Sequence, residues 1–389
     1  MSAKILVVDD EPDLEQLILQ KFRKQIRDQV FSFVFAANGV EALERLEEDE
    51  SIELILTDIN MPEMDGLTLL TRIKEKKNPL LRSVIVSAYG DIENIRTAMN
   101  RGAFDFVIKP IDLNDLEITV EKSLLDLQTL KEAMSSRDQL MFIRHELSIA
   151  TDIQLSILPK TFPPFPDRKE FDIYAKMIPA REVGGDLYDF FPIDKHRIGC
   201  IIGDVSGKGI PAAMFMAVSK TLLKATALKG IPPDSCLEIV NNILVDESVA
   251  SMFVTVFYGI FDSRNGSLEY CNGGHNPPFI IGKDGTVRQV ENRGGVFLGA
   301  VKNLEYESNI LTLQPGETLF LYTDGVTEAM NPDDDMFEEQ RTQESLQRHA
   351  GLGIEQLVEN LFVDVQAFAA GREQSDDITC LALRYFGKK

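Results

Sequence analysis

The stretch LILTDINMPEMDG, residues 54–66, decides the fold of the first part of the chain. It begins with a nearly continuous apolar run and passes directly into an acidic residue, Asp58. Near-continuous apolar strands that alternate with amphipathic helices are typical of a parallel sheet covered on both faces. The sequence therefore predicts a doubly wound α/β domain over residues 1–122. Four further runs belong to the same pattern: KILVV at 4–8, FSFVFA at 31–36, SVIVS at 83–87 and FVIK at 106–109.

Polar side chains stand at the ends of four of these predicted strands. Asp9 and Asp10 end the first strand, Asp58 the third, Ser87 the fourth and Lys109 the fifth. Because the carboxyl ends of parallel strands meet at one edge of a sheet, we expect the five side chains to converge. Carboxylates in one place repel one another unless a cation lies among them, and Mg²⁺ prefers such oxygen ligands. The sequence therefore predicts a magnesium site at this edge.

Such a site can carry out phosphoryl transfer, which mainly needs an in-line nucleophile and positive charge near the phosphoryl oxygens. Asp58 is the predicted nucleophile. Asp9, Asp10 and the backbone carbonyl of Asn60 would hold Mg²⁺, with Asp58 as a further ligand. The remaining phosphoryl oxygens would contact two side chains, Lys109 and Ser87.

Over residues 3–122 the chain resembles the response-regulator receiver family. The motifs VVDDEP, TDINMPEMDG, VSAYGD and VIKP carry this resemblance, each at the expected strand end. The resemblance implies that a sensor histidine kinase supplies the phosphoryl group to Asp58. It also implies that Phe106 is the switch residue, which rotates inward when Ser87 moves towards the phosphate. Composition alone is equally consistent with Phe106 as a core side chain.

A helical pattern without glycine or proline runs from residue 112 to the leucine at 158. Its apolar residues recur every seven positions, a spacing typical of a coiled-coil seam. We therefore predict a helical linker over residues 123–160 and a homodimer formed through it. The alternative is a long helix packed on its own domain. The seam consists of Leu113, Val120, Leu127, Met134 and Met141, with Leu116 and Leu130 beside it, and the polar residues Ser123, Arg137 and Arg144 weaken it.

The segment LPKTFPPFP, residues 158–166, ends this helix because its four prolines cannot continue one. Short β-type runs and blocks of helical pattern follow, which predicts an α+β sandwich over residues 161–389. The helical stretches are expected at 211–229, 235–248 and 354–370.

Aspartates recur in four turn-like segments of this second domain, most of them flanked by glycine. Glycine permits the tight backbone in which an acidic side chain and a neighbouring carbonyl face one ion. Aspartates without His or Cys partners favour Mg²⁺ or Mn²⁺ over zinc. Two such ions that share a water could hydrolyse a phosphate ester without a covalent intermediate. The segments are VGGDLYD (183–189), GDVSGKG (203–209), YTDGVTE (322–328) and QSDDIT (374–379).

From about residue 147 to 385 the chain resembles the metal-dependent PPM-type protein phosphatases, in their SpoIIE/RsbU-like bacterial branch. ELSIATDIQLSILP (146–159) and NGGHNPP (272–278) carry further parts of this resemblance. It implies a β-sandwich flanked by helices, with Asp204 as the catalytic bridge between two metal ions and the Val205 carbonyl beside it. Asp186 would bind one ion and Asp324 and Asp376 the other, with Asp377 as a rival to Asp376. Four glycines would shape the loops: Gly184, Gly185, Gly207 and Gly325. His275 would orient substrate or solvent, or would be a structural residue.

In this branch the implied substrates are phosphoserine or phosphothreonine on STAS-type anti-sigma-factor antagonists. Phosphorylation of Asp58 would then control the phosphatase through the linker helix. Two alternatives stay open: a non-catalytic adaptor that binds a partner, and a phosphatase for small phosphate esters.

Composition excludes several other classes of protein. The formal net charge of −22 argues against nucleic-acid binding, which depends on Lys and Arg. No apolar run approaches the roughly 18 residues of a membrane span, and the N-terminus lacks a leader pattern, so a cytoplasmic protein is expected. Four isolated cysteines indicate buried thiols in a reducing compartment: Cys200, Cys236, Cys271 and Cys380.

Overall fold

The computed structural model describes residues 2–88, 91–247, 252–291 and 295–387. The chain divides into two compact units, residues 1–143 and 144–389. Tyr89 and Gly90 of the VSAYGD motif lie outside the described residues. Within the described ranges, no helix combines the length and the apolar character that a bilayer crossing requires.

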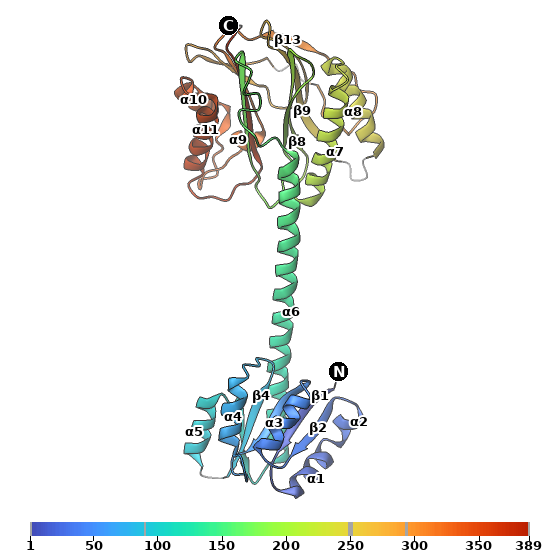
Figure 1. Cartoon of the computed structure of the whole chain (residues 1–389), viewed down its shortest axis with the longest axis vertical. Coiled ribbons are helices and arrows are strands. Elements are labelled where there is room, and N and C mark those ends of the chain that lie inside the picture. The colour runs from blue at the N-terminus through green and yellow to red at the C-terminus, as the bar shows by residue number, and fades with distance from the viewer. Residues whose placement is uncertain (1, 89–90, 248–251, 292–294, 388–389) are drawn as a thin grey trace. The chain divides into compact units, whose positions relative to one another are not determined.

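The first unit contains a five-stranded parallel sheet with the strand order β2-β1-β3-β4-β5 (Figure 1). This confirms the predicted doubly wound α/β domain. The strands are β1 Ala3–Val8, β2 Phe31–Ala36, β3 Ile52–Asp58, β4 Arg82–Ala88 and β5 Asp105–Lys109. The helices are α1 Pro12–Lys21, α2 Arg23–Arg27, α3 Gly39–Glu48, α4 Gly66–Glu75, α5 Ile92–Arg101 and the first part of α6 Leu113–Ile157.

Helices cover both faces of this sheet because its strands are apolar on both sides. Apolar side chains of α1 and α6 pack on one face, and those of α3, α4 and α5 pack on the other. The strand order reverses between β1 and β3, so their carboxyl ends lie side by side without a crossing helix between them. Asp9 follows β1 directly and Asp58 ends β3, which places both at this point.

The first turns of α6 belong to the core of the first unit. Leu116 and Val120 pack in its hydrophobic core, Leu127 is also buried, and the Lys131 ammonium lies 2.6 Å from a Glu53 carboxylate oxygen. For this part of the helix, the burial of these residues fits the alternative of a long helix packed on its own domain. A seven-residue repeat also describes the buried face of a single helix. Met134 and Met141, further along, are 40% and 60% exposed.

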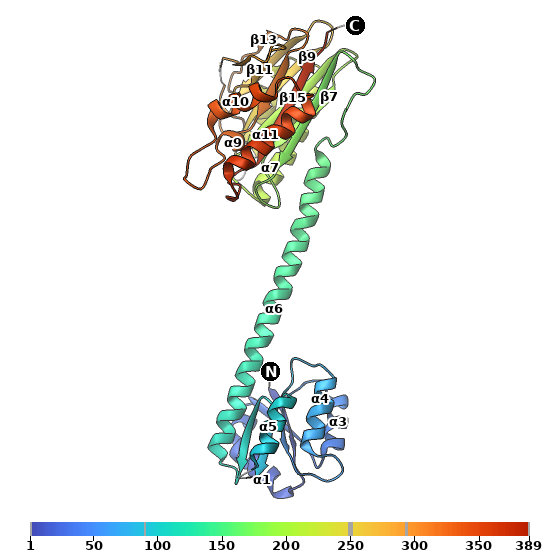
Figure 2. The same ribbon diagram turned by 90° about the vertical axis from the view of Figure 1, so that its left-hand side faces the viewer.

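The second unit contains two five-stranded antiparallel sheets, ordered β13-β10-β9-β8-β7 and β12-β11-β14-β15-β6 (Figure 2). This confirms the predicted sandwich. Its strands are β6 Phe171–Ile178, β7 Leu187–Pro192, β8 Arg197–Val205, β9 Val254–Asp262, β10 Ser267–Gly273, β11 Phe279–Ile281, β12 Val287–Gln289, β13 Asn309–Thr312, β14 Thr318–Tyr322 and β15 Ile378–Tyr385. Its helices are α7 Ile210–Ala227, α8 Pro233–Glu247, α9 Asp324–Thr327, α10 Glu338–His349 and α11 Ile354–Ala369.

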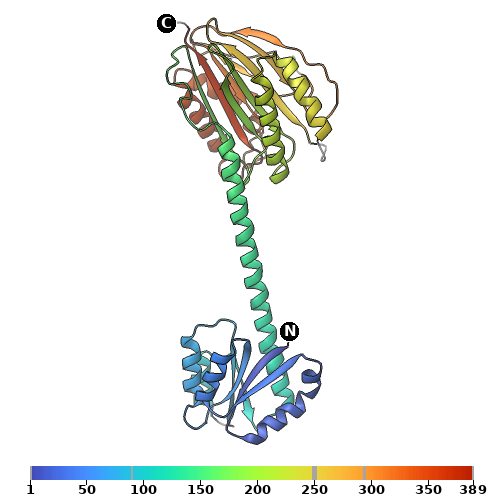
Figure 3. The same ribbon diagram turned by 45° about the vertical axis from the view of Figure 1, so that its right-hand side comes forward.

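Helices flank the two sheets of the sandwich (Figure 3), and three apolar layers hold it together. One lies between the sheets, one joins the first sheet to α7 and α8, and one joins the second sheet to α10 and α11. The alternation of side chains along a strand divides β14 between two layers: Leu319 and Leu321 face the other sheet, and Phe320 and Tyr322 face the helices. The three predicted helices correspond to α7, α8 and α11, whereas α10 was not predicted.

Candidate functional sites

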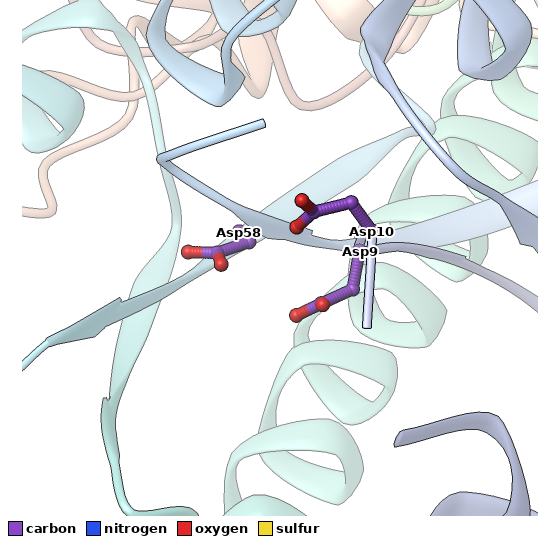
Figure 4. Close-up of side chains that lie close together, drawn as sticks. All are labelled: Asp9, Asp10 and Asp58. Carbon is purple, nitrogen blue, oxygen red and sulfur yellow. The ribbon is translucent and has the colours of Figure 1, made fainter. Parts of the chain in front are cut away.

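The first candidate site lies at the carboxyl ends of β1 and β3. Asp9, Asp10 and Asp58 bring three carboxylate oxygens within 4.8 Å of one another (Figure 4). Asp58 is 7% exposed, and its Oδ1 atom accepts a hydrogen bond from the Ile59 amide at 2.6 Å. The structure thus brings together the three carboxylates that the sequence analysis placed at this edge. Asn60 follows closely and is exposed.

Lys109 places an ammonium group among these carboxylates. Its Nζ atom lies 2.8 Å from Asp58 Oδ2, 3.1 Å from Asp9 Oδ2 and 3.1 Å from Glu11 Oε1. Burial alone would lower the pKa of Lys109, but these hydrogen bonds outweigh burial and raise it. Burial raises the pKa of Asp9, and the neighbouring Asp58 charge adds to that shift. The contact with Glu11 was not predicted.

The two predicted switch residues lie on neighbouring strands. Ser87, on β4, is 1% exposed, and its hydroxyl has no hydrogen-bond partner among the described residues. Phe106, on β5, is 37% exposed and is therefore not a core side chain in this conformation. A buried hydroxyl without a partner is unfavourable, and a phosphoryl oxygen would satisfy it.

The second candidate site lies where both sheets of the sandwich end. Asp186 comes just before β7 and Asp204 lies near the end of β8, which pairs with β7. Asp324 begins α9 directly after β14, and Asp376 lies just before β15, the partner of β14. Strand pairing within each sheet therefore brings these aspartates to one end of the sandwich, two from each sheet.

Burial and mutual repulsion change the ionisation of this group. Burial and the charges of Asp324 and Asp376 raise the pKa of Asp204 to about 8. Burial, Glu328 and Asp376 raise the pKa of Asp324 to about 6. Burial, Asp204 and Asp377 raise the pKa of Asp186 well above its ordinary value, although the Thr323 hydroxyl donates to its Oδ2 atom at 2.8 Å. If all of these carboxyls were ionised, the group would carry more negative charge than its surroundings neutralise, so without a cation some of them take up a proton.

One cation reaches this group from its edge. Lys208, in the GDVSGKG segment, has its Nζ atom 3.0 Å from Asp376 Oδ2 and donates a hydrogen bond to the Ser375 carbonyl. The sequence analysis missed both Lys208 and Thr323. The position of the lysine between two glycines was a possible signal, but nothing in the sequence shows which carboxylate it reaches.

Asp377 uses its carboxylate to hold the backbone of the loop before β7. Its Oδ1 atom accepts from the Ala180 amide at 2.8 Å, and its Oδ2 atom accepts from the Gly185 amide at 2.6 Å and from the Asp186 amide at 3.3 Å. Asp376 makes no such set of amide contacts and is partly exposed. The two neighbours thus differ: Asp377 fixes the loop, and Asp376 faces the other aspartates.

Two glycines allow these segments to approach one another. A Cβ atom at Gly184 would lie 2.3 Å from Asp377 Oδ2, and one at Gly325 would lie 2.0 Å from the Asp377 carbonyl oxygen. At the next position, a Cβ atom on Gly185 would lie 2.9 Å from the Val205 carbonyl oxygen, the predicted metal ligand. A larger residue at Gly184 would have to displace the Asp377 carboxylate, and one at Gly325 would require a shift of the backbone.

His275 is buried and held by contacts at one ring nitrogen and at its backbone, which favours the structural alternative. It is 2% exposed, its Nδ1 atom lies 3.0 Å from the Thr255 hydroxyl, and its backbone exchanges hydrogen bonds with the Asn272 side chain. Burial lowers the pKa of His275 to about 4, so the ring is neutral at pH 7.

Both sites suit a divalent cation by the chemistry of their donors. Each collects carboxylate oxygens without His or Cys ligands, the set that Mg²⁺ and Mn²⁺ prefer. They differ in spacing: across the described ranges, only Asp9, Asp10 and Asp58 place three possible ligand atoms within 4.8 Å of one another. The second set is wider, and burial together with repulsion between carboxylates raises the pKa of Asp186, Asp204 and Asp324.

Comparison with known proteins assigns a family to each part of the chain. Residues 5–121 match the family model described as response regulator receiver domain, and residues 194–386 match the model described as Stage II sporulation protein E (SpoIIE).

Two curated relatives share the second part. The protein IcfG of Synechocystis is 32% identical over 267 residues, covering 62% of this chain and 41% of IcfG. The phosphoserine phosphatase RsbU of Bacillus subtilis is 31% identical over 246 residues, covering 62% of this chain and 70% of RsbU.

A solved structure supports the fold of the second unit. The SiaA-PP2C domain of Pseudomonas aeruginosa aligns with a TM-score of 0.56 and 20% identity, covering 64% of this chain and 98% of that domain. At this identity the likeness concerns the fold alone. Taken with the motif matches and the two carboxylate sites, the comparisons show that the chain belongs to the response regulators that join a receiver domain to a SpoIIE-type domain of the PPM phosphatase family.

Proposed function

We propose that this chain is a phosphorylation-controlled, metal-dependent protein phosphatase. The observation that carries the proposal is the convergence of Asp186, Asp204, Asp324 and Asp376 at one end of the sandwich, with raised pKa values in three of them. Buried carboxylates that repel one another are strongly stabilised by a divalent cation. The relative RsbU, named as a phosphoserine phosphatase, supports the same reaction class.

In this proposal Asp204 bridges two Mg²⁺ or Mn²⁺ ions, with the Val205 carbonyl beside it. Asp186 binds one ion, and Asp324 and Asp376 bind the other. Bound metal supplies an activated water and stabilises the charge that develops on the phosphate ester. Thr323 holds the Asp186 carboxylate in place, and Asp377 holds the loop that carries Asp186. The amide contacts of Asp377 favour Asp376 as the ligand of this pair.

The receiver is the proposed input of the protein. A sensor histidine kinase would transfer a phosphoryl group to Asp58 with Mg²⁺ held by Asp9, Asp10 and the Asn60 carbonyl. Lys109 and the unpaired Ser87 hydroxyl would take the phosphoryl oxygens. Phe106 would then move from its exposed position towards the space that Ser87 leaves.

The end of α6 offers a route from the receiver to the metal ligands. Gln154 is 5% exposed, accepts a hydrogen bond from the Gly184 amide at 3.0 Å, and donates to the Gly184 carbonyl. The Thr151 hydroxyl also donates to the Glu182 carbonyl, at 2.5 Å. Both contacts lie within the same loop as Asp186. Movement of this helix would therefore shift Asp186 relative to Asp204, a switch of the kind that local charge can bias.

We propose a phosphorylated STAS-type anti-sigma-factor antagonist as the substrate and a homodimer formed along α6 beyond Leu127 as the assembly. The test is phosphate release from phosphorylated STAS proteins by the full chain, with Mg²⁺, Mn²⁺ or a chelator, and with or without an acyl-phosphate donor. We expect metal-dependent release that changes when Asp58 is phosphorylated. Partner binding without phosphate release would support the adaptor alternative, and equal rates on free phosphoserine would support a phosphatase for small esters.

A further inference from the structure

Lys208 is the cation that the structure places against the four aspartates of the second unit. Its Nζ atom lies 3.0 Å from Asp376 Oδ2 and also donates to the Ser375 carbonyl. Among the ion pairs of the described residues, this is the one that reaches Asp186, Asp204, Asp324 or Asp376. The contact places positive charge at the position where the proposed function needs a metal ion.

The segment that carries Lys208 is free of packing on both sides of the lysine. Gly207 and Gly209 have φ angles of +89° and +76°, and a Cβ atom at either position would meet nothing within 4 Å. The Lys208 side chain is 39% exposed. A lysine has a flexible four-carbon stem, so its ammonium can change partners without a shift of β8 or α7.

A pocket next to Asp376 offers the Lys208 ammonium a second position. Lys208 lines an open pocket of about 950 Å³ together with Arg181, Arg372 and Ser375. The three basic residues outnumber the two acidic ones of this pocket, Glu182 and Glu373. Arg372 is held by the Asn331 carbonyl at 2.7 Å and by Asp334 at 2.6 Å. With the charge of Arg372 balanced by Asp334, Arg181 and Lys208 are the basic side chains of this pocket that offer a phosphate group a charged partner beside the acidic metal site.

We propose that Lys208 is a two-position cation: in the metal-free protein it neutralises Asp376, and in the metal-loaded protein it binds the phosphoryl group of the substrate in this pocket. The inference rests on the proposed function. Two cations that share one carboxylate repel each other, so a divalent ion at Asp376 displaces the ammonium. The displaced ammonium gains a charge-assisted hydrogen bond to a phosphate oxygen.

This model predicts opposite effects of Lys208→Met on two binding constants. Mg²⁺ binding no longer competes with an ion pair, so calorimetry on the full chain should show Kd for Mg²⁺ about threefold to fivefold lower. Inorganic phosphate loses a contact, so ³¹P NMR titration of the Mg²⁺-saturated protein should show Kd for phosphate about tenfold higher. A lysine with a purely structural role would weaken both. Lys208→Arg should restore most of the phosphate affinity because it keeps the charge.

Lys195→Met is the matched control. Lys195 is exposed in the turn between β7 and β8, at the opposite end of these strands from Asp186 and Asp204, so both constants should stay at their original values. Mg²⁺ binding by the receiver is the same in every variant, so it does not contribute to the difference in Kd between variants. Unchanged or weaker Mg²⁺ binding in Lys208→Met, or unchanged phosphate binding, overturns the inference while the proposed function stands. A parent chain whose second unit binds no divalent metal overturns both.

Discussion

The two acidic sites of this chain are both built from aspartates, but the negative charge of the carboxylates is balanced differently in each. In the receiver, the Lys109 ammonium lies among the carboxylates and contacts Asp58, Asp9 and Glu11. In the SpoIIE-type domain, Lys208 reaches the group from its edge and contacts Asp376, and the pKa values of Asp186, Asp204 and Asp324 are raised. The receiver site contains its own cation. In the second site, most of the aspartates have no cationic partner among the described residues.

This difference corresponds to the chemistry proposed for each site. A receiver must hold its metal weakly enough to respond to phosphorylation. An ammonium within the site competes with the metal ion and is already in position to bind an oxygen of the phosphoryl group. A hydrolase needs its ions throughout the reaction, and uncompensated buried carboxylates bind them strongly. The comparison therefore predicts that the presence or absence of metal changes the activity and stability of the second unit more than the stability of the first.

Loss of the bridging carboxylate should have the largest effect. Asp204→Asn removes the charge that both proposed ions share, so metal-dependent phosphate release should fall on the order of a thousandfold, the scale of lost charge stabilisation in active sites. Asp58→Asn is the counterpart in the receiver and should leave unstimulated release within about threefold. Rates measured with Mn²⁺ on a phosphorylated STAS protein test both. Substantial activity in Asp204→Asn would contradict the metal assignment.

Gly325→Ala should cost the second unit about 3 kcal/mol of unfolding free energy, because the new Cβ atom would lie 2.0 Å from the Asp377 carbonyl oxygen. Urea unfolding of the full chain measures the loss. Gly351→Ala is the matched control, since a Cβ atom there meets nothing within 4 Å. Equal stability of the two variants would show that the loop around Asp377 is not closely packed.

How far the sequence could predict these two sites differs for a topological reason. The carboxyl ends of parallel strands must share an edge, so Asp9, Asp10, Asp58 and Lys109 could be placed together from the strand pattern alone. The aspartates of the second unit lie on four segments of two antiparallel sheets, so their recurrence in turns could only suggest a shared metal site, and the role of each aspartate came from family resemblance. The choice between Asp376 and Asp377 depends on amides far away in the chain, at Ala180 and Gly185.

Two other features were hidden from sequence analysis. The helix α10 has the sequence EEQRTQESLQRH, and its buried residues are Thr342, Ser345 and Leu346, so its apolar face is too small to produce a helical periodicity. In α6 the reverse occurred: a clear heptad pattern was present, but it has a different structural cause in the first turns of the helix. Leu116 and Val120 follow the spacing of a coiled coil but pack in the receiver core.

The unbalanced charge of the second site should make the metal-free protein sensitive to pH. The folded-state pKa of Asp204 is raised to about 8 from an ordinary value of 3.8, so the folded state binds more protons than the unfolded state. Its stability contribution is complete below pH 3.8 and is lost as pH rises through 8. In chelator we expect a loss of about 2 kcal/mol between pH 6.5 and pH 8 from Asp204, and Asp186, whose pKa is also raised, adds a loss of the same sign.

Urea unfolding of the second unit at several pH values tests this loss. His275 has the opposite sign, because its lowered pKa costs stability only as pH falls below 6.5. The chosen window therefore excludes its contribution. Saturating Mg²⁺ should flatten the pH profile, and Asp204→Asn should make it shallower without metal because Asp186 remains. A profile that is already flat in chelator would mean that the charges are balanced in another way.

The smallest effect should come from making the receiver resemble the second site. Lys109→Met removes the internal cation and leaves Asp58 and Asp9 to repel each other, so the metal-free receiver should lose about 1 to 2 kcal/mol of unfolding free energy. Mg²⁺ should restore more stability to this variant than to the parent chain, because the ion then has no ammonium to displace. Thermal unfolding with and without Mg²⁺ measures both effects.

Lys122→Met is the control, since Lys122 is 62% exposed in its pair with Asp105 and an exposed pair contributes about 0.5 kcal/mol or less. If Mg²⁺ stabilised Lys109→Met no more than the parent, the internal ammonium would not compete with metal, and the contrast between the two sites would rest on spacing alone.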